Sequence, residues 1–164
     1  MLTLPVYHHP SRDDVLAVTK RRPDVDFDVL MPTRLPFGYR LESAELIPYA
    51  RDLLFMTFVG QGRRSFRFSQ RIKTVSLDEE IRITGVPHSR ANYGSSSFVV
   101  VAGSYEGEPG DVWHWHQNRR VIKWEQDTMT CEITIVLASS PSVETCLKVA
   151  SSVRPLPANA HTTG

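Results

Sequence analysis

Three consecutive segments decide the fold of this chain: Leu53-Leu-Phe-Met-Thr-Phe-Val59, Gly60-Gln-Gly62 and Ser65-Phe-Arg-Phe-Ser-Gln-Arg-Ile-Lys73. The first is almost wholly apolar, which predicts a central strand covered on both faces. The third alternates, so its apolar residues, Phe66 and Phe68 among them, share one side of a strand. Because the glycine turn between the two segments is short, we expect an antiparallel hairpin.

The other side of the third segment carries mostly cations. Arg67, Ser69, Arg71 and Lys73 point away from its apolar side. Such a row is typical of a sheet face in contact with water, because surface charges need no other explanation. The same residues could instead bind an acidic partner, and the sequence leaves this alternative open.

Strand patterns flank this hairpin on both sides. Before it, we expect a half-buried strand that ends at Pro32 and a long strand that Pro48 places at or near a sheet edge. After it, a second hairpin is expected around the polar turn Gln126-Asp127-Thr128. The expected strands cover 27–31, 39–49, 98–105, 121–125 and 130–137, and a loop covers Val86–Ser97. The segment Asp78–Gly85 fits either a strand or one helical turn, and we favour a strand over 81–84.

Two helices are expected, one near each end of the chain. Ser11 caps the first, which stops at Pro23. The last helix begins at Ser140, with Pro141 in the favoured first position. Its buried stripe follows the three-and-four spacing of Val143, Cys146, Leu147, Ala150 and Val153.

Strands follow strands instead of alternating with helices, which predicts an α+β fold. We expect a single, mostly antiparallel sheet of about six to seven strands packed against the C-terminal helix, with a short N-terminal helix. At 164 residues, with 41% hydrophobic and 23% charged content, the chain has the size and composition of one globular domain. The predicted organisation is an N-terminal arm (1–10), one domain (11–153) and a flexible C-terminal tail (154–164).

Charge and apolar patterning argue against two kinds of partner. Nineteen Lys and Arg against eighteen Asp and Glu leave a net charge of +1, which gives no support to a nucleic-acid partner. No segment approaches the roughly 20 apolar residues of a membrane span, and Met1–Pro10 lacks the pattern of a signal peptide. Membrane insertion of this chain is therefore not expected. The two cysteines, Cys131 and Cys146, form either one disulfide or two buried thiols.

The segment Trp113-His114-Trp115-His116 is the main candidate for ligand binding. On an extended chain its tryptophans face one side and its histidines the other. The tryptophans either pack on the core or form the wall of a groove for an apolar or peptide ligand. The histidines either lie in water or supply half of a metal site, with Glu108 or Asp111 as further ligands. Because that ligand set is incomplete, we predict no metal.

Motifs for catalysis are missing from the sequence. It holds neither a Gly-x-Ser-x-Gly nucleophile elbow nor a cysteine in a catalytic setting, and Cys146 falls on the buried stripe of the last helix. The glycines of Gly60-Gln-Gly62 join two strands and open no helix, so they do not form a phosphate cradle. We therefore predict a protein that is not an enzyme, with no catalytic residue and no cofactor.

Two sequence signatures point to a known family. The first has the form Pro-x-x-Leu-Pro-x-Gly-Tyr-x-Leu, and its residues are Pro32, Leu35, Pro36, Gly38, Tyr39 and Leu41. The second is a tryptophan followed by a hydrophilic turn, an alternating strand and a short helix, and its residues are Trp124, Ile133, Ile135, Leu147, Ala150 and Ser152. In their order and spacing they resemble a bacterial family of uncharacterised extracytoplasmic domains. Members occur in membrane-anchored, anti-sigma-factor-like and lipoprotein-like proteins. The first signature is also similar to the C-terminal domain of periplasmic sigma-E regulatory proteins.

This resemblance implies a role in recognition and an extracytoplasmic location; without it, the sequence points to the cytoplasm. The chain departs from the family in showing no membrane anchor and no sigma-binding segment, which affects the signalling role more than the fold. The first hypothesis is a sensory or protein-interaction module that binds a protein, a peptide or an envelope component. The second is a carrier of a small or lipophilic ligand, with a pocket between the sheet and the C-terminal helix.

Overall fold

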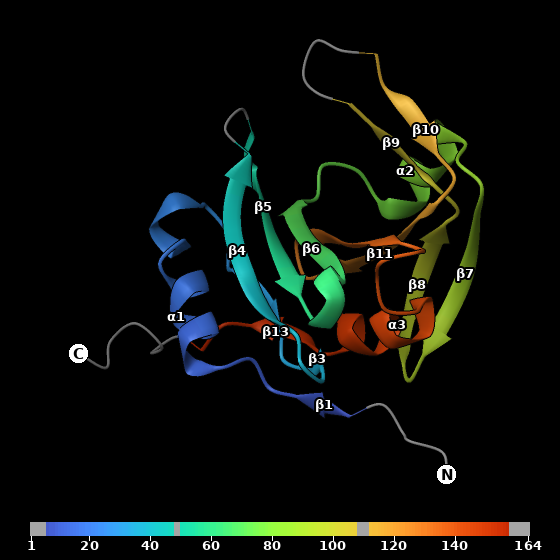
Figure 1. Cartoon of the computed structure of the whole chain (residues 1–164). Coiled ribbons are helices and arrows are strands. Elements are labelled where there is room, and N and C mark those ends of the chain that lie inside the picture. Colours follow the sequence, from blue (N-terminus) through green and yellow to red (C-terminus); the bar gives the residue numbers. More distant parts are fainter. Residues whose placement is uncertain (1–5, 48–49, 108–111, 158–164) are drawn as a thin grey trace.

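The computed structural model of this chain describes residues 6–47, 50–107 and 112–157. Its centre is a seven-stranded antiparallel sheet with the strand order β4-β5-β6-β12-β11-β8-β7 (Figure 1). The fold is α+β, as the sequence predicts. The strands of the sheet are β4 (Arg40–Ile47), β5 (Ala50–Val59), β6 (Ser65–Ile72), β7 (His88–Tyr93), β8 (Ser96–Val101), β11 (Arg119–Gln126) and β12 (Met129–Val136).

Helices and short strand pairs surround this sheet. The helices are α1 (Arg12–Thr19), α2 (Leu77–Thr84) and α3 (Val143–Ser151), with single 3-10 turns at η1 (Arg22–Asp24) and η2 (Gln61–Arg63). The short strands pair as β1 (Tyr7–His8) with β3 (Leu35–Pro36), β2 (Leu30–Pro32) with β13 (Val153–Pro155), and β9 (Ser104–Glu106) with β10 (His114–His116). In Figure 1, α3 and β13 lie along the lower end of the sheet, whereas the β9–β10 hairpin rises at the upper right.

The β5–β6 hairpin forms as predicted, with Met56 opposite Phe68 and Phe58 opposite Phe66. The expectation that β5 is covered on both faces is wrong. Met56 and Phe58 are fully buried, whereas Phe55, which points to the other face, is only half-buried. The run is apolar on both sides because one side meets the core and the other lines an open groove. The edge position expected for 39–49 is confirmed for β4, and Pro48 lies outside the described residues.

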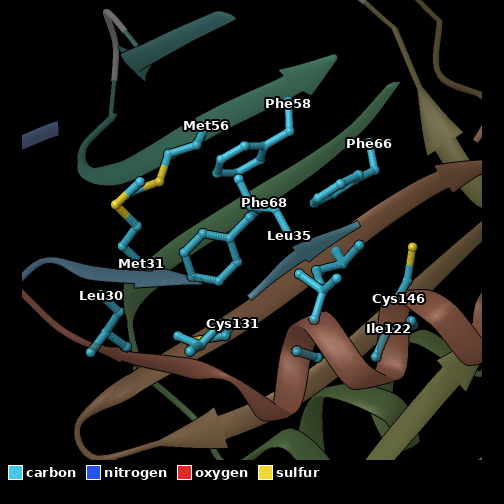
Figure 2. Packing of buried hydrophobic residues seen from close by; sticks show 14 of the residues in the cluster. Leu30, Met31, Leu35, Met56, Phe58, Phe66, Phe68, Ile122, Cys131 and Cys146 are labelled. Carbon is cyan, nitrogen blue, oxygen red and sulfur yellow. The ribbon is translucent and has the colours of Figure 1, made fainter. Parts of the chain in front are cut away.

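The main core lies between the sheet and a layer formed by α3, β2, β3 and β13. Figure 2 shows its packing, in which the rings of Phe58, Phe66 and Phe68 lie over side chains of β2 and β3. Cys131 on β12 and Cys146 on α3 are free thiols, both fully buried in this core. Burial raises the pKa of each thiol to about 12, so both stay protonated at neutral pH.

A smaller core lies on the opposite face of the sheet, under α2. Leu77 and Ile81 of this helix pack against Val99, Val101 and Val121. The two cores are on opposite faces because side chains alternate along a strand. Val100, between the two valines of β8, belongs to the main core.

The strand expected at 81–84 is wrong, because this segment belongs to α2. Ser76 caps the helix by accepting a hydrogen bond from the backbone N–H of Glu79. Gly85 ends it in the left-handed conformation, with φ +62°. The segment is alternately apolar, but only Ile81 is buried, whereas Ile83 is 64% exposed. The capping residues Ser76 and Gly85 therefore favour a helix over a strand in this segment.

The loop expected over Val86–Ser97 is also wrong. Most of this segment forms β7 and the start of β8, which turn at Gly94 with φ +62°. The single strand expected at 98–105 is divided into β8 and β9, because Gly103 adopts φ +144°, which breaks the extended chain. The hairpin around Asp127 forms as predicted, although Leu137 lies past its end and is 49% exposed.

The end of the chain differs from the sequence expectation in two places. Helix α3 is capped by Ser142, whose side chain accepts from the N–H of Thr145. Ser140, the expected cap, instead accepts from the N–H of Val136 and donates to the carbonyl of Ser65. The sequence predicts a flexible tail from Arg154 on, but β13 extends through Pro155 and Leu156 is buried.

The N-terminal region keeps its predicted helix. Ser11 caps α1 as expected, by accepting from the N–H of Asp14. The predicted arm is paired in part, since β1 contacts β3. The half-buried strand expected at 27–31 is wrong, because consecutive residues of β2 are buried on both sides. The reason is its position between β13 and the sheet, where the side chain of Gln70 hydrogen-bonds to both the N–H and the carbonyl of Leu30.

Candidate binding groove

A groove of about 920 Å³ lies on the face of the sheet opposite the main core. Its floor is formed by residues of five adjacent strands, β5, β6, β12, β11 and β8, and these residues alternate with core residues. The floor residues include Phe55, Thr57, Arg67, Ser69, Thr134 and Val121. Its wall comes from the β9–β10 hairpin and from the end of α2, and includes Tyr105, Trp113, Trp115, His116 and Thr84. A volume of this size is typical of ligand sites in proteins.

The hairpin wall is fixed by aromatic packing. Trp115 lies directly opposite Tyr105 in the strand register, and their rings meet edge to face at 4.9 Å between centroids. The indole of Trp115 also covers Gly103 so closely that a β-carbon there would lie 2.3 Å from Cζ2 of the ring. Trp115 additionally contacts the small core under α2. The wall is therefore anchored to the sheet through Trp115.

The structure brings three of the four predicted ligand-binding residues to the groove. Trp113, Trp115 and His116 line it, whereas His114 is exposed and lies away from it. The side chain of Trp113 is 54% exposed, which leaves its ring free to contact a ligand. The sequence offers two roles for the tryptophans, packing on the core or forming a groove wall. Trp115 has both, because it packs against the small core and also lines the groove.

An ionic cluster occupies the end of the groove next to α2. Lys123 Nζ donates to Glu80 Oε2 at 3.1 Å and lies 3.0 Å from Glu132 Oε1. Arg71 donates to Glu80 and lies 3.9 Å from Glu132. Burial alone would raise the pKa of Glu80, but Lys123 and Arg71 lower it below the usual value of a carboxyl group. The two cations and two carboxylates balance one another.

A second ion pair joins the hairpin to the sheet. Arg119 Nε donates to Glu106 Oε1 at 2.8 Å, and Ser104 Oγ donates to the same oxygen at 3.2 Å. The hydrogen bond from Arg119 is the main reason why the pKa of Glu106 is lowered. This pair therefore helps to hold the hairpin beside the groove.

Arg67 lies on the floor of the groove. Its guanidinium carbon lies 4.8 Å from the centroid of the Phe55 ring, in a cation–π contact. Within the described parts of the chain no carboxylate lies within 4.0 Å of it, and its direct cross-strand neighbours are Thr57 and Thr134. The cationic row is thus not uniform, since Arg71 and Lys73 are paired with glutamates.

Across residues 6–47, 50–107 and 112–157, no three His, Cys, Asp or Glu side chains are grouped so that they could hold a metal ion. Glu108 and Asp111, the further ligands considered with the two histidines, lie outside the described residues. At the N-terminus, Nδ1 of His8 and Nδ1 of His9 each lie within hydrogen-bond distance of a backbone carbonyl.

No local pattern in the sequence identifies Phe55, Tyr105 or the residues of the ionic cluster as parts of one site. Phe55 belongs to the apolar run of β5, and such a run predicts a buried strand, not the floor of a groove. The ion pairs of Glu80 with Lys123 and Arg71 cannot be predicted from a strand at 81–84, because Glu80 lies on helix α2. Position on the groove depends on the order of strands in the sheet, which joins segments more than 60 residues apart.

Comparison with protein-family models, curated proteins and solved structures gives no match to this chain.

None of the helices among the described residues combines the length and the apolar character needed to cross a membrane.

Proposed function

We propose that this chain is a non-enzymatic binding module that takes an extended peptide segment of a partner protein in the groove. The observation that carries this proposal is the composition of the groove: an aromatic wall faces a floor of hydroxyl and charged side chains. Aromatic anchors beside polar groups are typical of peptide recognition, because a peptide offers both apolar side chains and a polar backbone. The family resemblance adds the setting, a sensory or regulatory protein of the bacterial envelope.

A lipophilic carrier is the alternative, and two observations favour a peptide over it. The space between the sheet and α3, where the sequence placed a pocket, holds packed core residues such as Ile133 and Cys146. The groove that does exist carries Ser69, Thr134 and Arg67 along its floor. An acyl chain would remove water from these polar groups without offering them hydrogen bonds, which costs free energy.

A non-enzymatic role is supported by the state of the two thiols. Cys131 and Cys146 are fully buried, and their pKa values of about 12 keep the nucleophilic thiolate form scarce. Neither is among the residues that line the groove.

Selection of peptides by the purified chain tests this proposal. A phage-displayed library of random dodecapeptides is selected on the wild-type protein, and enriched peptides are synthesised and titrated by fluorescence anisotropy. We expect Trp113→Ala to weaken their binding about tenfold or more, because interface aromatics carry much of the binding energy. Trp113 is already half-exposed, so the variant should stay folded.

Phe37→Ala is the matched control for this experiment. Phe37 is 71% exposed and lies outside the groove, in the turn before β4. Its removal should leave peptide affinity unchanged. If no peptide is enriched, or if enriched peptides bind both variants as well as they bind the wild type, the groove is not a peptide site.

A further inference from the structure

Among the described residues that line the groove, the Lys and Arg side chains differ in whether they have a carboxylate partner. Three of its four Lys and Arg side chains have a carboxylate partner, namely Arg71, Lys123 and Arg119. The fourth, Arg67, has no carboxylate within 4.0 Å in the part of the chain described by the structure. The groove therefore offers one cation whose charge no described carboxylate neutralises.

The surroundings of Arg67 are suited to a carboxylate. Thr57 and Thr134 lie directly beside it on the neighbouring strands, and both line the groove. Their hydroxyl groups can donate hydrogen bonds, and the guanidinium group can donate two parallel ones to a carboxylate. Phe55 stacks against the guanidinium, which orients it and shields one side of it from water.

From this arrangement we propose that the groove selects acidic peptides, with an Asp or Glu side chain of the partner bound to Arg67. The proposal rests on the proposed function and adds the chemical class of the partner. An apolar side chain of the same peptide lies against Trp113 and Trp115.

The strand register sets the spacing between these two contacts. Arg67, Thr134, Val121 and Val101 form one row across four adjacent strands, and the row leads to the base of the hairpin wall. Two to three strand spacings separate Arg67 from the wall, roughly 10–14 Å. An extended peptide covers this distance in about three to four residues.

Peptide selection on two proteins tests the inference. The dodecapeptide library is selected on the wild type and on Arg67→Gln, and the best wild-type peptide is synthesised with its own Glu or Asp and with the matching amide. In the wild type, the amide peptide should bind about tenfold more weakly. Arg67→Gln should lose about the same factor for the acidic peptide, and the two changes together should cost no more than one of them.

Two control variants define the cause of that loss. Arg12→Gln removes one positive charge from the exposed surface of α1 and should leave affinity within twofold. Arg67→Lys keeps the charge but loses the planar donor pair, and should keep the preference for the acidic peptide at a few-fold lower affinity. Thermal unfolding followed by circular dichroism shows that each variant is folded.

The outcomes separate this inference from the function on which it rests. Peptides that require Trp113 but lack acidic residues, or that bind Arg67→Gln as well as the wild type, overturn the acidic preference and leave peptide binding in place. If no peptide binds, both proposals fall. Palmitate, a carboxylate on an apolar chain, is the remaining probe: its binding without any peptide binding would overturn both in favour of the carrier.

Discussion

On one face of the sheet, Met56, Phe58 and Phe68 are fully buried beneath α3 and the short strands, whereas on the other face Phe55 and Arg67 line an open groove. The same strands supply both sets of residues, since neighbours along a strand point to opposite faces. The fully buried side chains described on the first face are apolar, except for that of Gln70. The second combines aromatic, hydroxyl and charged groups.

This difference would separate stability from the proposed peptide recognition within one sheet. Burial of apolar area is the dominant favourable term in folding, and most of it lies on the α3 side. Only one end of the other face is covered, by α2 and its small core. Substitutions on the α3 side should therefore change the free energy of unfolding, and those in the groove should change binding.

The strongest test compares two phenylalanines on adjacent strands. Phe68→Ala removes a fully buried ring from the main core and should lower the free energy of unfolding by about 3–5 kcal/mol. Phe55→Ala removes a half-buried ring that faces the groove, and should cost about 1 kcal/mol or less. Urea denaturation measures both. Equal losses would mean that the groove face contributes as much to folding as the core does.

The next effect concerns the buried amide of the main core. Gln70 accepts from the N–H of Leu30 at 2.8 Å and donates to its carbonyl at 2.9 Å. Gln70→Leu leaves both backbone groups unpaired in the core and should destabilise the chain by about 3 kcal/mol in urea denaturation. Gln61→Leu, at an exposed position of η2, is the control and should cost little. If Gln70→Leu left the free energy of unfolding unchanged, β2 would keep its position without this amide.

A glycine substitution should disturb the groove more than the core. A side chain at Gly103 would collide with Trp115 and would adopt φ +144°. Gly103→Ala should cost about 2 kcal/mol and also weaken peptide binding, because Trp115 must move. Gly94→Ala is the matched control: its φ of +62° is also unfavourable, but no atom lies within 4 Å of the added carbon. It should cost about 1 kcal/mol and leave binding unchanged, and equal binding by both variants would contradict the role of Trp115.

Sequence patterns predict most of the main core, which lies on the face of the sheet that packs against α3. Alternation in β6 and β12 identified Phe68 and Ile133 as core, and the stripe of α3 placed Cys146 against them. These signals are local, because each depends only on the spacing of apolar residues along one element. The signals that place α2 were also local, with a cap at Ser76 and a glycine at 85, but alternation around Ile81 outweighed them.

The groove could be predicted only in part. Trp113 and Trp115 were recognised as candidates from their own pattern, and the cations of β6 from theirs. Their position on one groove depends on β6, β12, β11 and β8 lying side by side, which is a long-range property. Single-sequence patterns do not define which strands pair across such distances. For the same reason, only the structure shows that Arg71 is neutralised and that no described carboxylate lies next to Arg67.

The smallest expected effect comes from the ionic cluster at the end of the groove. Glu80 is mostly buried, and it joins α2 to the sheet through Lys123 and Arg71. Glu80→Gln should lower the free energy of unfolding by about 1 kcal/mol at neutral pH, because Lys123 keeps Glu132 as a partner. Glu79→Gln, beside it on α2, removes only an exposed pair with Arg82 and should have no measurable effect.

The dependence on pH distinguishes an ionic contribution of Glu80 from a merely structural one. Burial would raise the pKa of Glu80, but Lys123 and Arg71 lower it below its ordinary value of 4.5, so the folded chain holds the proton less tightly than the unfolded chain. The stabilisation by Glu80 is therefore complete above that value and is lost as the pH falls through the lower folded pKa. Urea titrations at neutral pH and at steps below 4.5 should show the difference between wild type and Glu80→Gln shrinking. A difference that stays constant with pH would assign the effect to packing of α2 instead of to charge.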